Sequence, residues 1–187
     1  ARAVAKKIGG EKIAVCDPDS KKTDAIRDEY GAAVLDIRTI AVSCDYLFLG
    51  VKPQVMEAVV GSFRDVIGGR KDIVVVTMAA GLGIGFISGI TGGCRVIRIM
   101  PNTPALVGEG MILIAPGEGI TDDETAGLRE LLGAAGRTDV IQEKLIDAAS
   151  AVSGCGPAYA YMFCEALADG AVECGIPRDK ALLYASQ

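Results

Sequence analysis

The chain contains 187 residues, half of them hydrophobic, with 24 glycines, no tryptophan and no histidine, and its formal net charge is −5. The negative charge opposes binding to nucleic acid or to an anionic membrane, and no apolar stretch is long enough to span a bilayer. The lack of histidine excludes Ser-His-Asp and Cys-His catalysis, as well as dehydrogenases that use a histidine as their acid–base catalyst.

The six cysteines do not indicate a metal centre. None of them forms a C-x-x-C pair, and no histidine is present to complete a zinc site. Their simplest interpretation is as small buried apolar residues in a reducing compartment. Because residues 1–8 also lack the apolar core and the cleavage site of a signal peptide, we expect a cytoplasmic protein.

Apolar runs of strand length alternate with segments of helix length over the first three quarters of the chain. The predicted strands are residues 12–16, 32–35, 46–51, 73–78, 95–100, 111–115 and 137–141. The predicted helices are residues 20–30, 53–64, 84–90 and 122–132, with residues 1–8 as the tail of an earlier helix. Thr121 and Glu124 form the capping box that starts the helix at residue 122. This alternation predicts an α/β fold with a Rossmann-like, doubly wound, mostly parallel sheet, which binds its ligand beyond the carboxyl ends of the strands.

The pattern changes to helices alone after Gln142, so we place a domain boundary there, with residues 1–142 before it and residues 143–187 after it. Residues 157–174 are apolar except for one narrow stripe made by Glu165, Asp169 and Glu173. A helix that is apolar around most of its circumference must be enclosed. Either a second subunit or further helices of the same protein would cover it.

The glycine fingerprint of dinucleotide binding, G-x-G-x-x-G, is absent between the first predicted strand and helix. Residues 81–85 (GLGIG) follow a strand, but their third glycine comes one position early and no acidic residue follows at a strand end about 20 residues later. We interpret them as a structural turn and expect the phosphate loop to precede Ala1. In that frame Asp17 ends the second strand, where it would accept hydrogen bonds from ribose hydroxyls or serve only as a turn residue.

Three segments together resemble the pyrroline-5-carboxylate reductase family. They are Val51-Lys52-Pro53, residues 100–104 (MPNTP) and residues 153–159 (SGCGPAY). The resemblance implies reduction of 1-pyrroline-5-carboxylate to L-proline by NADPH or NADH, the final step of proline biosynthesis. It also implies that the helical part is the start of an all-α oligomerisation domain, which associates in a homodimer or a larger assembly. A protonated cyclic imine accepts hydride without a strong acid from the protein, so no catalytic residue is identified.

The resemblance assigns the binding residues position by position. The cofactor-binding residues it implies are Cys16, Asp17, Pro18, Gly50, Val51, Lys52, Pro53, Ala79, Ala80, Gly81 and Asn102. The substrate-binding residues it implies are Thr103, Glu143 and Ser153. From the sequence alone, Glu143 is nearly as well explained as a glutamate in the first turn of a helix.

Two features keep the specificity open. Many relatives carry Ser, Thr, Asn or Arg where Asp17 stands. Asp17 would repel the 2′-phosphate of NADP, whereas Lys21 and Lys22 would attract it. NADH and NADPH therefore remain alternatives. The loop that holds the substrate carboxylate in the family would follow Gln187, so we expect these 187 residues alone to be inactive. The competing interpretations are another imine or hydroxyacid dehydrogenase and a non-catalytic, nucleotide-sensing paralogue.

Overall fold

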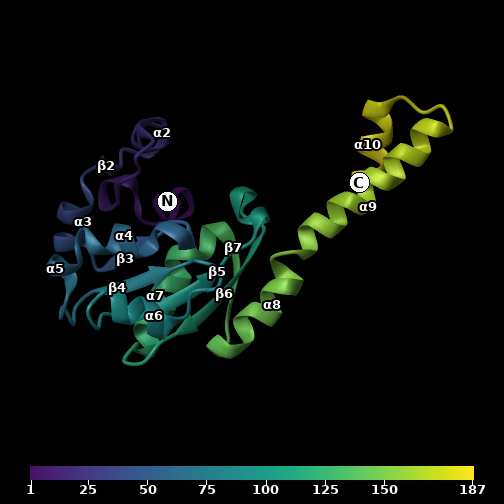
Figure 1. Cartoon of the computed structure of the whole chain (residues 1–187). Helices are drawn as coiled ribbons and strands as arrows, with labels where there is room; N and C mark the ends of the chain where they lie inside the picture. Colours follow the sequence, from purple (N-terminus) through teal and green to yellow (C-terminus); the bar gives the residue numbers. More distant parts are fainter.

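The computed structural model describes residues 1–187, which form an α/β body and a helical arm that extends from it (Figure 1). The strands are β1 Ala14–Val15, β2 Ala33–Val34, β3 Tyr46–Leu49, β4 Val74–Thr77, β5 Arg95–Met100, β6 Gly110–Pro116 and β7 Gly136–Val140. The α-helices are α1 Arg2–Ile8, α2 Ser20–Tyr30, α3 Ile37–Ser43, α4 Met56–Gly61, α5 Arg64–Ile67, α6 Ile84–Ile90, α7 Asp122–Leu132, α8 Ile146–Ser153, α9 Gly156–Glu173 and α10 Arg178–Ser186. Short 3₁₀ turns are η1 Gly10–Lys12, η2 Pro53–Val55, η3 Thr103–Val107, η4 Gly133–Ala135 and η5 Glu143–Leu145.

The main sheet has five strands in the order β3-β4-β5-β6-β7, and β1 and β2 form a separate parallel pair. All neighbours in the main sheet are parallel except β5 and β6. The link between these two strands holds only η3 and a few loop residues, whereas a parallel crossover needs about a dozen residues or more. The predicted α/β fold with a mostly parallel sheet and following helices is confirmed, with this antiparallel pair and the separate β1–β2 pair as its departures.

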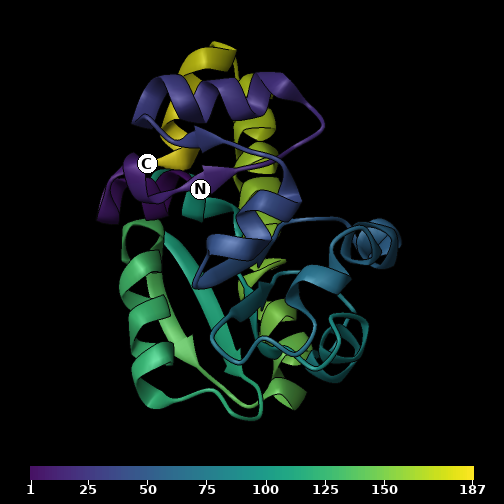
Figure 2. The same ribbon diagram turned by 90° about the vertical axis from the view of Figure 1, so that its left-hand side faces the viewer.

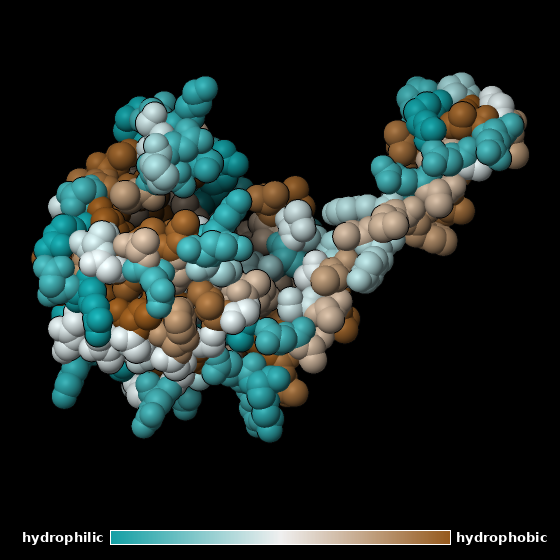
Figure 3. Space-filling view, in the orientation of Figure 1, coloured by the Kyte–Doolittle hydropathy of each residue, from teal (hydrophilic) through white to brown (hydrophobic).

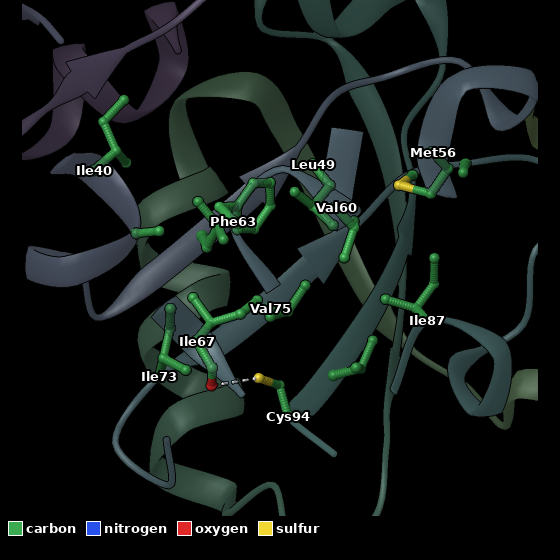
Figure 4. Close-up of a cluster of buried hydrophobic side chains, with 14 residues drawn as sticks. Ile40, Leu49, Met56, Val60, Phe63, Ile67, Ile73, Val75, Ile87 and Cys94 are labelled. Carbon is green, nitrogen blue, oxygen red and sulfur yellow. Dashed lines mark hydrogen bonds between the residues drawn. The ribbon is translucent and has the colours of Figure 1, made fainter. Parts of the chain in front are cut away.

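Helices cover both faces of the main sheet. On one face, Val75 and Val96 pack in a cluster with Met56, Phe63 and Ile87 from α4, the segment after it, and α6 (Figure 4). On the other face, Val76, Ile97 and Ile114 pack against Leu128 and Leu132 of α7. Successive side chains of a strand point to opposite faces, which explains how one apolar strand serves both clusters.

The arm leaves the body after β7. Helix α8 packs on β6, whereas α9 continues away from the body. Helix α10 folds back along α9 (Figures 1 and 2). None of the helices combines the length and the hydrophobicity that a membrane crossing requires.

Several predicted elements have different bounds in the structure. The predicted helix 53–64 is divided among η2, α4 and the start of α5. At the end of α4, the N–H groups of Ser62 and Phe63 donate to carbonyls three residues back, and the Ser62 hydroxyl donates to Val59 O at 2.7 Å. The predicted strand 12–16 begins as η1 and keeps only Ala14–Val15 as a strand. Helices 84–90 and 122–132 and strand 95–100 are confirmed to the residue.

Candidate functional site

The carboxyl ends of β3, β4 and β5 meet at one edge of the sheet. The three strands are parallel, with Leu49 opposite Thr77 and Thr77 opposite Arg98. The predicted cofactor residues that follow each strand are therefore neighbours along this edge. This is the position at which doubly wound sheets bind their ligands.

Small side chains keep the backbone of this edge accessible. Gly50, Ala80 and Gly81 are exposed, whereas Ala79 is buried. Gly81 has a φ of 75°, a left-handed conformation that favours glycine, and no atom lies within 4 Å of where its Cβ would be. Lys52 is exposed and extended before Pro53, which starts η2.

Glu143 contacts the start of α6 from the beginning of the helical arm. Its Oε1 atom accepts a hydrogen bond from the backbone N–H of Ile84 at 2.6 Å and lies 3.2 Å from the Cβ position of Gly83. A carboxylate of the same chain therefore holds the first free N–H of α6. This contact supports the interpretation of residues 81–85 as a structural turn rather than a phosphate cradle.

Arg98 is a buried cation beneath Glu143 that sequence reasoning missed. Its residue is 3% exposed, and its Nη2 donates to Asp147 Oδ1 at 2.7 Å. Its Nη1 lies 3.9 Å from Glu143 Oε1, which is an ion pair beyond hydrogen-bond distance. The available signal was a charged residue inside the apolar strand RVIRIM.

Asn102 ties the loop after β5 to the end of α8. Its Nδ2 donates to Ser153 O, and its Oδ1 accepts from the N–H of Met111, both at 2.8 Å. The Ser153 hydroxyl donates to Ala149 O at 3.1 Å, and Thr103 is exposed at the start of η3. The structure therefore joins Asn102 directly to one predicted substrate residue, and each polar group of the Asn102 side chain makes one hydrogen bond within the chain.

Asp17 lies in the loop that follows β1 of the separate β1–β2 sheet, with Cys16 and Pro18, and all three residues are exposed. Asp17 Oδ1 accepts from the N–H of Asp19 at 2.9 Å and lies 3.7 Å from Lys22 Nζ. The residue thus serves as a turn residue, one of its two predicted roles. Its exposed carboxylate also remains accessible to a ligand.

Two concavities of the molecule contain no predicted site residue. One, of about 270 Å³, is lined by Lys7, Ile8, Tyr46, Gly127, Glu130 and Leu131. The other, of about 430 Å³, is lined by Gly108, Glu109, Gly110, Met111, Gly133, Gly136 and Arg137. No cluster of three or more Cys, Asp or Glu side chains is arranged to hold a metal ion.

Two family profiles match separate parts of the chain. Residues 1–81 match a family described as NADP oxidoreductase, coenzyme F420-dependent. Residues 143–187 match a family described as pyrroline-5-carboxylate reductase dimerisation.

Known proteins are similar over longer stretches. The pyrroline-5-carboxylate reductase of Escherichia coli (strain K12) is 37% identical over 178 residues, which cover 94% of this chain and 65% of that protein. The enzyme of the same name from Synechocystis sp. is 37% identical over 189 residues, which cover 100% of this chain and 70% of that protein. The chain thus spans about two thirds of the length of these relatives.

Solved structures share the fold over the whole chain. A pyrroline-5-carboxylate reductase from Coxiella burnetii superposes with a TM-score of 0.89 at 27% identity and covers 100% of this chain and 72% of its own. Pyrroline carboxylate reductase of Plasmodium falciparum, solved with NADP bound, gives a TM-score of 0.87 at 27% identity, over 100% of this chain and 69% of its own.

Proposed function

The chain belongs to the pyrroline-5-carboxylate reductase family, and from this premise we propose that the complete protein reduces 1-pyrroline-5-carboxylate to L-proline, the final step of proline biosynthesis. The observation that carries the proposal is the 37% identity to the Synechocystis reductase, which extends over the whole chain and 70% of that protein. The absence of histidine is compatible with this reaction, because a protonated cyclic imine is already electrophilic.

The proposed cofactor is NADPH or NADH, which supplies the hydride when bound. The accessible backbone at the ends of β3 and β4 would allow a dinucleotide to approach closely, because Gly50, Ala80 and Gly81 are small and exposed. The proposed cofactor contacts are Cys16, Asp17, Pro18, Gly50, Val51, Lys52, Pro53, Ala79, Ala80, Gly81 and Asn102.

The proposed substrate contacts are Thr103, Glu143 and Ser153. Asn102 holds the backbone next to Thr103 against Ser153, and Glu143 is fixed at the start of α6. These contacts hold the three residues to the strand-end edge that carries the proposed cofactor residues. A carboxylate at this place also favours the protonated, cationic form of the ring imine, which is the form that accepts hydride.

The proposed organisation is a nucleotide-binding domain over residues 1–142 and the first part of a helical domain over residues 143–187. The proposed partners are the small-molecule substrate and a second copy of the protein, with no nucleic acid or membrane among them, in keeping with the net charge of −5. All six cysteines are unpaired in the structure, which is compatible with work in the reducing cytoplasm.

The experiment is a spectrophotometric assay of the complete protein with 1-pyrroline-5-carboxylate and each reduced nicotinamide, followed by loss of the cofactor's near-ultraviolet absorbance. We expect cofactor oxidation that depends on the imine and yields proline in equal amount. Simple 2-hydroxy acids with the oxidised cofactors serve as the control substrates, and we expect no turnover of them. No turnover of the imine with either cofactor would overturn the proposal.

A further inference from the structure

We propose that Arg98 is a positioning residue of the substrate site, which acts by fixing the carboxylate of Glu143. The inference rests on the proposed function for its kinetic consequences, but its structural core is independent of the reaction. Arg98 lies in the middle of β5, and Glu143 lies at the first turn of the arm, so the pair links the sheet to the helical segment.

Burial makes the charge of Arg98 costly unless it is paired. The Arg98 side chain is 4% exposed, and its Nε atom is buried without a hydrogen-bond partner. An unpartnered buried donor destabilises the fold, and a buried cation adds a larger desolvation cost. The neighbouring strand positions, Thr77 and Ala115, are small, so an apolar side chain would fit there at lower cost. What the charge adds at this place is attraction for the two carboxylates above it.

The two carboxylates are held in different ways. Asp147 accepts a direct hydrogen bond from Arg98 at 2.7 Å, and its own side chain is 75% exposed. Glu143 lies 3.9 Å from the other terminal nitrogen of Arg98 and accepts from Ile84 N–H at 2.6 Å. The Oε1 atom of Glu143 therefore faces both a buried cation and the first N–H of α6. Without Arg98 only the single hydrogen bond would remain.

If Arg98 had only a structural role, its replacement would lower stability without a specific effect on the substrate site. Arg95 provides the matched control. Arg95 lies on the same strand, pairs with Glu124 at 2.6 Å and also has a buried Nε without a partner. Its partner belongs to α7, on the face of the sheet away from Glu143. Arg95→Met should therefore lower stability without changing the substrate site.

The first test is structural and needs no turnover. Amide hydrogen exchange of the peptide that contains Ile84 is measured in the complete protein by mass spectrometry, for wild type, Arg98→Met, Arg98→Lys and Arg95→Met. We expect roughly tenfold faster exchange in Arg98→Met, partial recovery in Arg98→Lys and no change in Arg95→Met. Equal exchange rates in wild type and Arg98→Met would overturn the inference. If Arg98→Met does not fold, Arg98→Lys is compared with wild type instead. The proposal predicts faster exchange in Arg98→Lys, and an equal rate would overturn it.

The second test is a kinetic double-mutant cycle. We expect Arg98→Met to raise KM for the imine roughly 10- to 100-fold while KM for the cofactor changes less than about twofold. Because Arg98 acts through Glu143, adding Arg98→Met to Glu143→Gln should cost little more than Glu143→Gln alone. The positioning role would be contradicted if the effects of the two substitutions on KM multiplied in the double variant. It would also be contradicted if Arg98→Met raised KM for the imine and KM for the cofactor equally. If wild type itself reduces no imine, the proposed function fails while the exchange comparison still decides whether Arg98 fixes Glu143.

Discussion

Single residues of the candidate site make contacts within the chain as well as the proposed contacts with ligands. Asp17 accepts the Asp19 N–H and pairs loosely with Lys22. Asn102 uses both groups of its amide to join the loop after β5 to Met111 and Ser153. Side chains held in this way keep their positions without a ligand, which would reduce the ordering cost of the proposed binding.

Asp17→Ser should shift cofactor preference toward NADPH. The substitution removes a carboxylate that accepts from ribose hydroxyls and repels a 2′-phosphate, and it releases Lys22 from its 3.7 Å contact. We expect the ratio of specificity constants to change by about 1–2 kcal/mol, or roughly 5- to 30-fold. Steady-state kinetics with both cofactors measures this ratio.

The control is Asp24→Asn, which removes an exposed carboxylate from α2 that pairs with Arg27 instead. The control should leave the ratio unchanged. A strong native preference for NADPH that Asp17→Ser does not alter would show that Asp17 does not face the ribose.

At the scale of elements, α7 begins at a complete capping box that also anchors β5. The Thr121 hydroxyl accepts from Glu124 N–H, the Glu124 carboxylate accepts from Thr121 N–H, and the same carboxylate pairs with Arg95. Burial raises the pKa of Glu124, but the hydrogen bonds from Thr121 and Arg95 and the Arg95 charge outweigh it, so the pKa lies below its ordinary value. The ionised glutamate is therefore the stabilising form.

Thr121→Ala and Glu124→Gln should both destabilise the fold, Thr121→Ala by about 1 kcal/mol. Because the folded-state pKa of Glu124 is depressed, its contribution is complete above the ordinary value of 4.5 and is lost as the pH falls through the folded-state value. The stability difference between wild type and Glu124→Gln should therefore shrink as the pH falls from 7 to acidic values. Urea unfolding at several pH values measures it, and a difference that grows on acidification would contradict the assignment.

Sequence patterns predicted the elements that local signals define. The capping box gave the start of α7, and the apolar run of residues 73–78 gave β4. Helix α3 was missed because it is short, although Asp36 caps it by accepting from Arg38 and Thr39. The predicted single helix after Pro53 was wrong because the segment starts as a 3₁₀ turn and tightens again at Ser62, and apolar periodicity does not register such changes.

The candidate site was predictable only in part. The family motifs placed the strand-end residues at one edge, since parallel strands end together. The contacts of Asn102 with Ser153 and of Glu143 with Ile84 join residues 51 and 59 positions apart, and no local pattern contains them. Arg98 and its pairing with Asp147 depend on how α8 docks on the sheet, which is also a tertiary property.

At the scale of the whole molecule, the arm presents apolar side chains to solvent. Tyr159, Met162 and Phe163 of α9 are each about two thirds exposed, at 65%, 66% and 65%. Figure 3 shows hydrophobic residues along this arm, beyond the reach of the body. An apolar surface of this extent is typical of an interface between subunits.

The complete protein should therefore be a homo-oligomer at micromolar concentration. We expect Phe163→Glu to weaken the assembly, because it places a charge in the apolar surface of α9, whereas Glu165→Gln on the polar stripe should leave it unchanged. Size-exclusion chromatography with light scattering measures the mass of each variant. A wild-type monomer would contradict the prediction.

In the proposed reaction, hydride passes from a nicotinamide to the carbon of the imine C=N bond. The most direct measurement uses a reduced cofactor that carries deuterium at the transferred position, with the complete protein and 1-pyrroline-5-carboxylate. Mass spectrometry of the product should find L-proline that has gained a single deuterium, on the ring carbon that belonged to the C=N bond. Proline without deuterium, or no proline with either cofactor, would contradict the account.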